Sequence, residues 1–364
     1  MLIVYLLATV ILINCAYYLL FSKFSFSKVP DHKSSVQYPV SVLICAKNEE
    51  ENLKNHIPSW LDQDYPDFEL VLINDASTDN SLELMQQFAL KDPRISIVDV
   101  VGNETFWGSK KYALTLGIKK AKHKRLLFTD ADCKPATNHW ISQMVSQLDE
   151  KRQIVLGYGG YQKVSGILNS IIRFETILTA TQYFSYAKAG IPYMGVGRNI
   201  AYTSNLFFEH GGFTSHMNIM SGDDDLFVNK AATASNTALQ FHPNSFTYSL
   251  PKTTFRDWLH QKKRHTSTAK YYRSKHKFLL SAYFIFNLAF WILAVVGCFT
   301  IFWKWVLPLV GFRFLIQVLV LGKAAAKLKE RSLIIFIPLL ELFLVFLQLL
   351  IFSSSRTTSH SPWK

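Results

Sequence analysis

Four long apolar stretches lie at the two ends of the chain. The first covers residues 2–21 and contains no charged residue, and the others cover residues 278–300, 305–322 and 333–352. A run of about 20 apolar residues is long enough to cross a bilayer as a helix. The first stretch lacks the basic leader and the small-residue cleavage site of a signal peptide, which favours an uncleaved anchor. The pattern therefore predicts one transmembrane helix near the N-terminus and three near the C-terminus.

Between these stretches, residues 39–160 alternate between short apolar runs and amphipathic segments. This alternation is typical of an α/β fold with a mainly parallel sheet and helices on both faces. Pro58 is expected to bend or end the first helix. The predicted strands are 40–45, 68–73, 95–99 and 126–128, and the predicted helices are 49–61, 77–90, 110–121, 140–148, 168–189 and 226–232.

Charge sets the expected orientation in the membrane. The net charge is +13, and Lys or Arg residues follow the first apolar stretch and separate the third from the fourth. By the positive-inside rule these flanks are cytoplasmic, which places the N-terminus and the C-terminal tail outside. Residues 252–277 hold nine Lys or Arg residues and adjoin a predicted span. We therefore expect this basic segment to bind anionic lipid headgroups rather than nucleic acid. The flanking cations are Lys23, Lys28, Lys33, Lys323, Lys327, Lys329 and Arg331.

The resulting domain plan has four parts, in an integral protein of the cytoplasmic membrane. The chain is expected to divide into an anchor (1–22), a cytoplasmic catalytic domain (23–277), three transmembrane helices (278–352) and a polar tail (353–364). The catalytic domain would include interfacial helices near 166–190 and 252–277. Arg313 and Glu341 fall inside predicted spans, where they either pair with each other or separately face the membrane surface and the helix bundle. The four cysteines form no metal-binding spacing, so neither a zinc site nor a disulfide framework is indicated.

Asp130 and Asp132 follow the predicted strand 126–128 and are separated by one small residue. Two like charges at the end of a buried strand are costly unless a cation or hydrogen bonds compensate them. Carboxylates in this arrangement suit a hard divalent cation such as Mg²⁺ or Mn²⁺. The alternative is a solvated turn, in which Asp is also common.

Polar clusters follow two further predicted strands, at residues 46–49 and 74–77. The carboxyl ends of parallel strands meet at one edge of a sheet and form a crevice of nucleotide size. The sequence has neither the glycine-rich dinucleotide motif nor a P-loop. We expect Ser77 or Thr78 to cap the following helix, which leaves Asp75 for binding a base or a ribose. Lys110 and Lys111 open the next helix and either meet a diphosphate or remain solvated.

The second half of the predicted catalytic domain holds three adjacent carboxylates, at residues 223–225. One Asp suffices to cap the helix that follows, and repulsion should raise at least one pKa, as a general base requires. A solvated acidic turn is the alternative. The glycine-bearing loop 194–202 enters a strand, and we predict that Gly197, Arg198 and Asn199 bind substrate. Further along, the guanidinium of Arg264 has the geometry to clamp a phosphate.

Taken in order, these motifs resemble those of membrane-anchored family-two glycosyltransferases of the GT-A fold. The resemblance covers roughly residues 38–275 and the arrangement of anchors. It rests on residues 40–50, 73–79, 129–132, 222–226 and 261–265, which read VSVLICAKNEE, INDASTD, TDAD, GDDDL and QKKRH.

The resemblance implies a role for each matching position. Ala46 and Glu49 would line the nucleotide pocket, and Asp75 would bind the nucleobase. Asp130 and Asp132 match the family's Asp-x-Asp motif, which holds the metal and the donor diphosphate, with the second Asp as the usual direct ligand.

Two matching positions depart from the family pattern. Asp223 matches the catalytic base, but the acid that precedes it in the family is Gly222 here, which leaves Asp224 or Asp225 as substitutes. Gln261 and Arg264 match a Gln-x-x-Arg-Trp element that braces the diphosphate and the acceptor. His265 replaces its Trp, so stacking on the acceptor there is in doubt.

The implied activity is an inverting, metal-dependent transfer from a UDP- or GDP-type nucleotide sugar. We expect the acceptor to be a lipid or a lipid-linked molecule at the inner membrane face, and a cell-envelope glycan to be the product class. Only three predicted spans follow the catalytic domain, which disfavours a processive polysaccharide synthase. The competing functions are those of a phosphatase of the Asp-x-Asp type, a transporter, and a non-catalytic scaffold that retains the fold.

Overall fold

The computed structural model describes residues 1–30, 37–101 and 109–354, so Lys33 and most of the predicted polar tail lie outside the described residues. Internal contacts divide the chain into two compact units. Within the described residues, the membrane-helix unit contains Met1–Lys28, Val164–Ala189 and the chain from Lys252 to Ser354. The sheet unit contains Val29–Lys163 and Gly190–Pro251.

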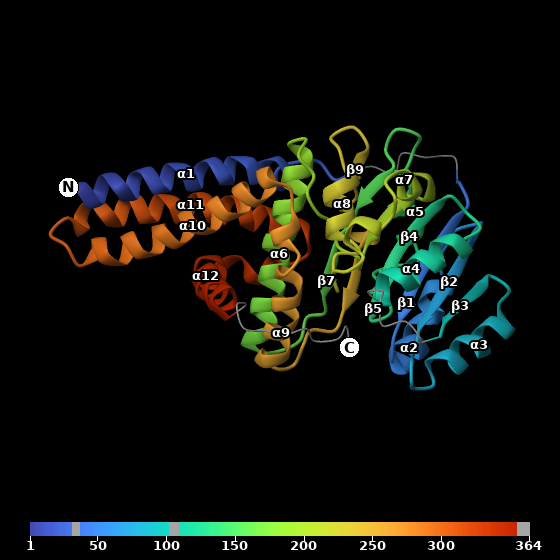
Figure 1. The fold of residues 1–364 in the computed structure, drawn as a ribbon. Helices are drawn as coiled ribbons and strands as arrows, with labels where there is room; N and C mark the ends of the chain where they lie inside the picture. Colours follow the sequence, from blue (N-terminus) through green and yellow to red (C-terminus); the bar gives the residue numbers. More distant parts are fainter. Residues whose placement is uncertain (31–36, 102–108, 355–364) are drawn as a thin grey trace. The chain divides into compact units, whose positions relative to one another are not determined.

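Within the described residues, the sheet unit is built on a seven-stranded sheet with the order β3-β2-β1-β4-β8-β6-β9 (Figure 1). Strands β1 to β4 run parallel, and β8 is antiparallel to both β4 and β6. A small sheet with the order β5-β10-β7 accompanies it. The predicted mainly parallel α/β sheet is therefore confirmed. The strand bounds are β1 Val40–Ala46, β2 Phe68–Asp75, β3 Ile95–Val100, β4 Arg125–Asp130, β5 Cys133–Pro135, β6 Ile154–Leu156, β7 Gly159–Tyr161, β8 Ile200–Thr203, β9 Thr237–Leu239 and β10 Thr247–Ser249.

Helices cover both faces of this sheet because alternate strand residues point to opposite sides. Val42 and Ile44 of β1 join a buried cluster with side chains of α2, α3 and α5. Leu43, between them, faces α4, where the absence of a side chain at Gly117 lets the helix approach Ile73 closely. The helices of the sheet unit are α2 Glu50–Leu61, α3 Ser81–Lys91, α4 Ser109–Lys120, α5 Trp140–Val145, α7 Ser204–Glu209 and α8 Asp225–Ala231, with short 3₁₀ turns at Thr214–His216 and Pro243–Ser245.

The prediction of a cap at Ser77 or Thr78 is wrong. Helix α3 begins at Ser81, and its N-cap residue is Asn80. The Asn80 side chain makes no capping hydrogen bond to the helix. Ser77 and Thr78 instead hydrogen-bond to Asn48, which ties the β2–α3 loop to the β1–α2 loop. Pro58 does not end α2, which continues to Leu61.

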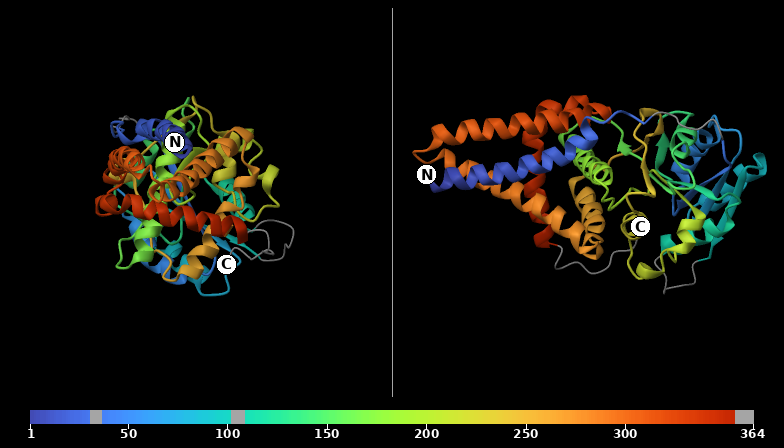
Figure 2. Two further views of the ribbon diagram at one scale, coloured as in Figure 1. Left: turned by 90° about the vertical axis from the view of Figure 1, so that its left-hand side faces the viewer. Right: turned by 90° about the horizontal axis from the view of Figure 1, so that it is seen from above.

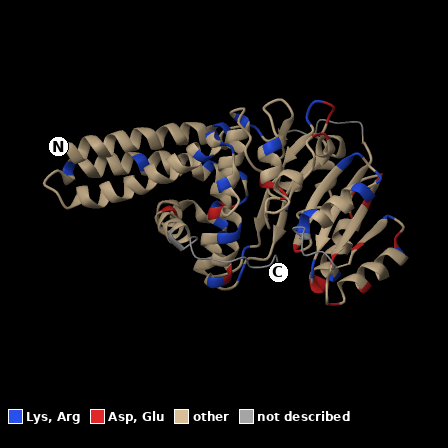
Figure 3. Ribbon diagram, in the orientation of Figure 1, with Lys and Arg blue, Asp and Glu red and all other residues tan. Residues whose placement is uncertain are grey.

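The membrane-helix unit contains α1 Leu2–Ser25, α6 Ile167–Lys188, α9 Phe255–Thr266, α10 Ser274–Cys298, α11 Trp303–Lys327 and α12 Ile337–Ser354, with 3₁₀ turns at Ala269–Tyr271 and Arg331–Phe336. Helix α1 packs against α6, α10 and α11, and Figures 1 and 2 show α1, α10 and α11 side by side. Within the described residues, four segments are long and apolar enough to cross a membrane: α1, α10, α11 and Arg331–Phe352. Figure 3 shows few charged residues along α1, α10 and α11.

Arg313 and Glu341 form an ion pair in the interior of the membrane-helix unit. Arg313 Nη1 lies 2.6 Å from Glu341 Oε2, and both side chains are almost completely buried. Arg313 also donates to Asn14, Asn287 and Gln317. These contacts join α1, α10, α11 and α12, so of the two alternatives for Arg313 and Glu341 the structure has the one in which they pair with each other.

Candidate active site

The carboxyl ends of β1, β2 and β4 meet at one edge of the large sheet, as the sequence predicted. Cys45 on β1 is in register with Asp130 on β4, and Ala46 is in register with Asn74 on β2. Asp75 follows Asn74, so the polar clusters after three strands lie at the same sheet edge. In open α/β sheets this edge is the usual ligand-binding position.

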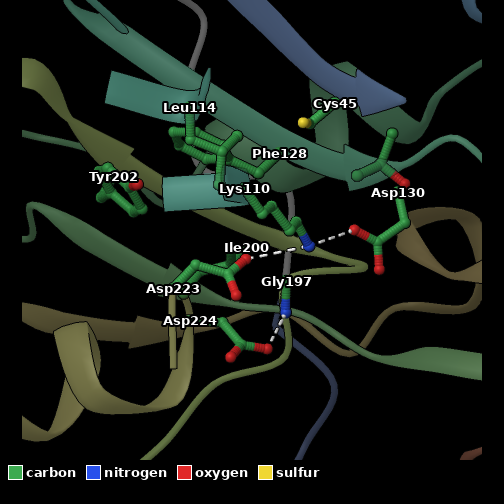
Figure 4. Close-up of a pocket in the computed structure, with 11 residues that line it drawn as sticks. Cys45, Lys110, Leu114, Phe128, Asp130, Gly197, Ile200, Tyr202, Asp223 and Asp224 are labelled. Atoms are coloured by element: carbon green, nitrogen blue, oxygen red, sulfur yellow. Dashed lines mark hydrogen bonds and ion pairs between the residues drawn. The ribbon is translucent and has the colours of Figure 1, made fainter. Parts of the chain in front are cut away.

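A pocket at this edge contains Lys110 between two carboxylates (Figure 4). Its Nζ atom lies 2.9 Å from Asp130 Oδ1 and 3.0 Å from Asp223 Oδ2. The start of α4 thus connects the end of β4 to the acidic cluster ahead of α8. The pocket is lined by Cys45, Lys110, Leu114, Phe128, Thr129, Asp130, Gly197, Ile200, Tyr202, Asp223 and Asp224.

The charges in this pocket compensate one another. Burial lowers the pKa of Lys110, but Asp130 and Asp223 outweigh that effect and hold it well above its usual value. Burial raises the pKa of Asp223, but the charge and the hydrogen bond of Lys110 leave it below its usual value. Both groups are therefore charged at neutral pH.

Asp130, Asp132 and Cys133 bring their possible ligand atoms within 4.8 Å of one another. Burial and the charge of Asp130 raise the pKa of Asp132. Burial also raises the pKa of the Cys133 thiol, which stays protonated and donates to Asp132 Oδ1 over 3.3 Å. The two carboxylates, not the thiol, therefore have the donor chemistry for a hard divalent cation.

Helix α2 holds the main chain of this loop at two points. His56 Nδ1 lies 3.0 Å from the carbonyl oxygen of Ala131, and Trp60 Nε1 donates to the carbonyl oxygen of Cys133 over 3.2 Å. These contacts flank Asp132 and fix the backbone on both sides of it.

The three adjacent carboxylates have different surroundings. Asp223 faces the ammonium of Lys110. Asp224 is the N-cap of α8 and accepts from the main-chain N–H groups of Asp225 and of Gly197, the latter over 2.6 Å. Burial, followed by the two neighbouring aspartates, raises the pKa of Asp224 to about 7. Asp225 is buried and accepts from the N–H of Leu226.

The backbone explains why glycine precedes Asp223. Gly222 has a φ of +97°, in the left-handed region that favours glycine. A Cβ at this position would lie 2.5 Å from Leu226 Cδ1. The acid that the family pattern has here therefore does not fit this backbone.

The predicted nucleotide side of the site lies on the β1–α2 and β2–α3 loops. Asp75 is 2% exposed, and Glu49 is the N-cap residue of α2. Asn48 and Ala76 have positive φ values of 54° and 51°, so one non-glycine residue in each loop is in the left-handed region. Such backbone strain is retained only where the surrounding contacts impose it, as the hydrogen bonds between these two loops do.

Two residues predicted to bind substrate lie in the interior instead. Asn199 is fully buried, and its side chain bonds to Trp140 Nε1 and to the carbonyl oxygens of Tyr158 and Ser245. Lys111 is 1% exposed and does not line the pocket, so neither alternative for the two lysines, contact with a diphosphate or exposure to solvent, holds for Lys111.

The other two residues predicted from the loop 194–202, Gly197 and Arg198, lie near the acidic side chains of the site. Gly197 lines the pocket. Arg198 Nη1 donates to Gly160 and Ser249, and its guanidinium lies 4.4 Å from the centre of the Tyr161 ring. Its charge acts on the pKa of the nearby Asp132.

The predicted Gln-x-x-Arg element lies on α9 of the membrane-helix unit. Gln261, Arg264 and His265 fall within this helix, which begins after the N-cap Thr254. The intervening Lys262 forms an ion pair with Glu175 of α6. The structure describes this element only within its own unit, so its role at the pocket stays a prediction.

Sequence reasoning did not find the apolar lining of the pocket. Tyr202 stacks on Phe128 with ring centres 4.4 Å apart, and Cys45 and Leu114 complete that side. In the sequence, these residues occupy positions typical of ordinary core residues of strands and helices, so nothing marked them as pocket residues. The ion pair of Lys110 with Asp223 was also missed, because it joins residues more than a hundred positions apart.

Comparisons with known proteins agree with this geometry. Residues 41–210 match the family described as Glycosyl transferase family 2. An uncharacterized glycosyltransferase of Haemophilus influenzae is 32% identical over 136 residues, which are 36% of this chain and 40% of that protein. A poly-beta-1,6-N-acetyl-D-glucosamine synthase of Staphylococcus epidermidis is 31% identical over 123 residues, which are 33% of this chain and 29% of that protein. The chain thus spans less than half of the length of these relatives.

A solved structure is similar over nearly the whole chain. It is the mannosyltransferase PcManGT of Pyrobaculum calidifontis in complex with GDP-Man and Mn²⁺, with a TM-score of 0.60 and 18% identity. The similarity covers 96% of this chain and 98% of that one. It establishes a shared fold.

Proposed function

We propose that the chain, which matches the Glycosyl transferase family 2 model over residues 41–210 and has a GT-A-like fold, is a nucleotide-sugar-dependent glycosyltransferase. It transfers a sugar, with inversion, to a lipid or lipid-linked acceptor. The observation that carries the proposal is the position of the Lys110 ammonium, 2.9 Å from Asp130 and 3.0 Å from Asp223. One ammonium can contact both carboxylates only if they border the same small space. A donor held at Asp130 would therefore present its sugar close to Asp223.

The donor is a nucleotide-diphosphate sugar of the UDP or GDP type. Ala46, Glu49 and Asp75 would bind the nucleoside at the ends of β1 and β2, with Asp75 accepting from the base. PcManGT, which shares the fold, was solved with GDP-Man. The cations Lys110 and Arg198 would contact the diphosphate, to which ammonium and guanidinium donors are suited.

A divalent cation, Mg²⁺ or Mn²⁺, would be held by Asp130 and Asp132. Their oxygen atoms fit a hard cation, and the structure leaves Asp132 with a raised pKa beside a second carboxylate. When bound, the cation stabilises negative charge on the leaving diphosphate.

Asp223 is the proposed base. Its pKa is below the usual value, so it is a carboxylate at neutral pH. It would accept the proton of the acceptor hydroxyl as that oxygen attacks the anomeric carbon from the side opposite the diphosphate. Asp224 has two main-chain donors to its carboxylate, and Asp225 is buried, so each is the weaker candidate.

The membrane-helix unit supports a lipid or lipid-linked acceptor. Among the described residues, four apolar segments are long enough to cross a bilayer, and α9 carries a cluster of basic residues before α10. We propose that the catalytic domain, residues 23–277, lies at the cytoplasmic face and that the C-terminal tail lies outside. Figure 2 shows α12 crossing the direction of α1, α10 and α11. Labelling a cysteine that is introduced into the tail, in intact cells, tests this topology, because a tail on the catalytic side would mean that α12 does not span.

The second candidate function is processive polysaccharide synthesis. It is favoured by the similarity to a polymer synthase of Staphylococcus epidermidis, although the match covers only 29% of that protein. The two functions differ in the size of the product.

The test uses membranes that contain the full chain, Mn²⁺, and a panel of radiolabelled UDP- and GDP-sugars. The proposal predicts a labelled product of one added sugar that partitions into organic solvent. Label that appears only in a high-molecular-weight polymer would favour the second candidate, and label that appears only on soluble acceptors would contradict both.

A further inference from the structure

Lys111 is a buried lysine next to the proposed base. Only 1% of its surface is exposed. Lysine is almost never fully buried unless its charge is compensated, because transfer of an ammonium out of water is costly. Its Nζ atom donates to the main-chain carbonyl of Ile219, four residues ahead of Asp223. Burying the Lys111 ammonium costs free energy, so we expect a structural role for this side chain.

The carbonyl belongs to the segment Gly211–Gly222, here called the base-bearing segment, which leads directly to Asp223. It begins and ends with glycines in the left-handed region, with φ values of 68° and 97°. Near its start, Lys230 of α8 donates to His210 and Ser215. Lys111 of α4 supplies the contact near its end.

The interior of this segment is packed. His216 is 7% exposed, and its ring lies 5.9 Å from that of Phe213. Burial, followed by the charge of Lys111, lowers the pKa of His216 to about 4, so this ring is neutral at physiological pH. Lys111 therefore bonds to an ordered part of the chain.

Helix α4 holds Lys111 in a fixed position relative to the sheet. It packs across β1, β2 and β3, and Gly117 lets it approach Ile73 and Leu43 closely. Two consecutive residues at its start point to different partners. Lys110 reaches Asp130 and Asp223, whereas Lys111 reaches the backbone of the base-bearing segment.

The charge of Lys111 also suits its surroundings. Burial lowers its pKa to about 8, and the nearby Asp223, Asp225 and Asp224 act in the opposite direction. An ammonium that interacts electrostatically with three adjacent carboxylates reduces their mutual repulsion. The Lys111 ammonium thus holds the base-bearing segment through Ile219 and also offsets the negative charge of the three aspartates that follow this segment.

We propose that Lys111 is a positioning residue that fixes Asp223 relative to the donor site through its bond to Ile219. This inference rests on the proposed function of Asp223 as the base. Lys111 does not line the pocket, so its loss should impair the chemical step and leave donor binding intact.

The test compares Lys111→Met, Lys111→Arg and a matched control, Lys120→Met, which removes an exposed lysine from the same helix. Lys111→Met should lower kcat for sugar transfer at least about tenfold, because small displacements of a reacting group cost that much or more. Its Kd for the nucleoside diphosphate with Mn²⁺ should stay close to that of the parent. Lys111→Arg should recover part of the loss, and Lys120→Met should behave like the parent.

Hydrogen exchange supplies a readout that needs no substrate. In Lys111→Met, the amides of residues 214–222 should exchange faster, with those of β1 and β4 unchanged. If the parent shows no transfer, the proposed function fails, but exchange still decides whether Lys111 orders the segment. If Lys111→Met does not fold, Lys111→Gln gives the same two readouts. Unchanged kcat and exchange would overturn the inference, and so would a parallel loss of donor binding, which would make Lys111 a donor ligand.

Discussion

Replacing Lys110 by methionine should weaken the folded protein and strengthen its binding of a cation. The substitution keeps the apolar stem and removes the ammonium between Asp130 and Asp223. Removing one partner of a buried ion pair typically costs about 3–5 kcal/mol. The Asp130 side chain is 31% exposed, so solvent screens its ion pair with Lys110. We therefore expect a loss of folding free energy near the lower end of this range, about 3 kcal/mol.

The assay is thermal unfolding of the detergent-solubilised chain, with and without Mn²⁺. A loss of this size lowers the midpoint by roughly 6–12 °C for an unfolding unit of about 150–250 residues, the range in which the sheet unit falls. Mn²⁺ should raise the midpoint more in Lys110→Met than in the parent, because the cation no longer competes with the ammonium for Asp130. Lys110→Arg, which keeps the charge, is the control. An equal effect of Mn²⁺ on both proteins, or a midpoint unchanged by the substitution, would refute this account of Lys110.

Three other substitutions test separate parts of the structure. Gly222→Ala should destabilise the chain by about 1–3 kcal/mol in thermal unfolding, because φ is +97° and the new Cβ would meet Leu226. A parent-like midpoint would contradict this. The pKa of Asp224 is raised to about 7, so the folded parent binds a proton that the unfolded chain releases near pH 4, and its stability falls as pH rises between these values. The stability of Asp224→Asn relative to the parent should therefore increase from pH 4 to pH 7, and a constant difference would argue against a raised pKa. Arg313→Leu leaves Glu341 buried without its partner and should cost about 3–5 kcal/mol, whereas the double change to leucine should recover most of that loss in the same measurement.

The sequence predicted the fold well where local patterns determine it. The apolar runs of β1, β2 and β4 alternate with amphipathic helices, and each of these runs forms a strand of the observed sheet. The polar residues after these strands meet at one edge because parallel strands align their carboxyl ends. The four long apolar stretches also appear as helices of sufficient length.

The sequence could not predict contacts that depend on packing. Ser77 has the chemistry of a helix cap, but the adjacent β1–α2 loop offers Asn48 as a partner, so the helix starts four residues later. Lys111 follows Lys110 directly, yet rotation along α4 turns one lysine into the pocket and the other into the interior. Asn199 also has a side chain suited to binding a ligand, but its amide forms hydrogen bonds with three buried partners in the protein. Tertiary competition for hydrogen-bond partners decided each case.

The measurement that tests the central claim most directly compares the chain with Asp223→Asn in membranes, across a panel of UDP- and GDP-sugars with Mn²⁺. The account predicts that the parent releases nucleoside diphosphate and places the sugar in the lipid fraction. Asp223→Asn should reduce this transfer by about 10²–10⁴-fold, the usual contribution of a general base, and should still bind nucleoside diphosphate. Transfer at the parent rate by Asp223→Asn would contradict the assignment of Asp223 as the base and the mechanism built on it.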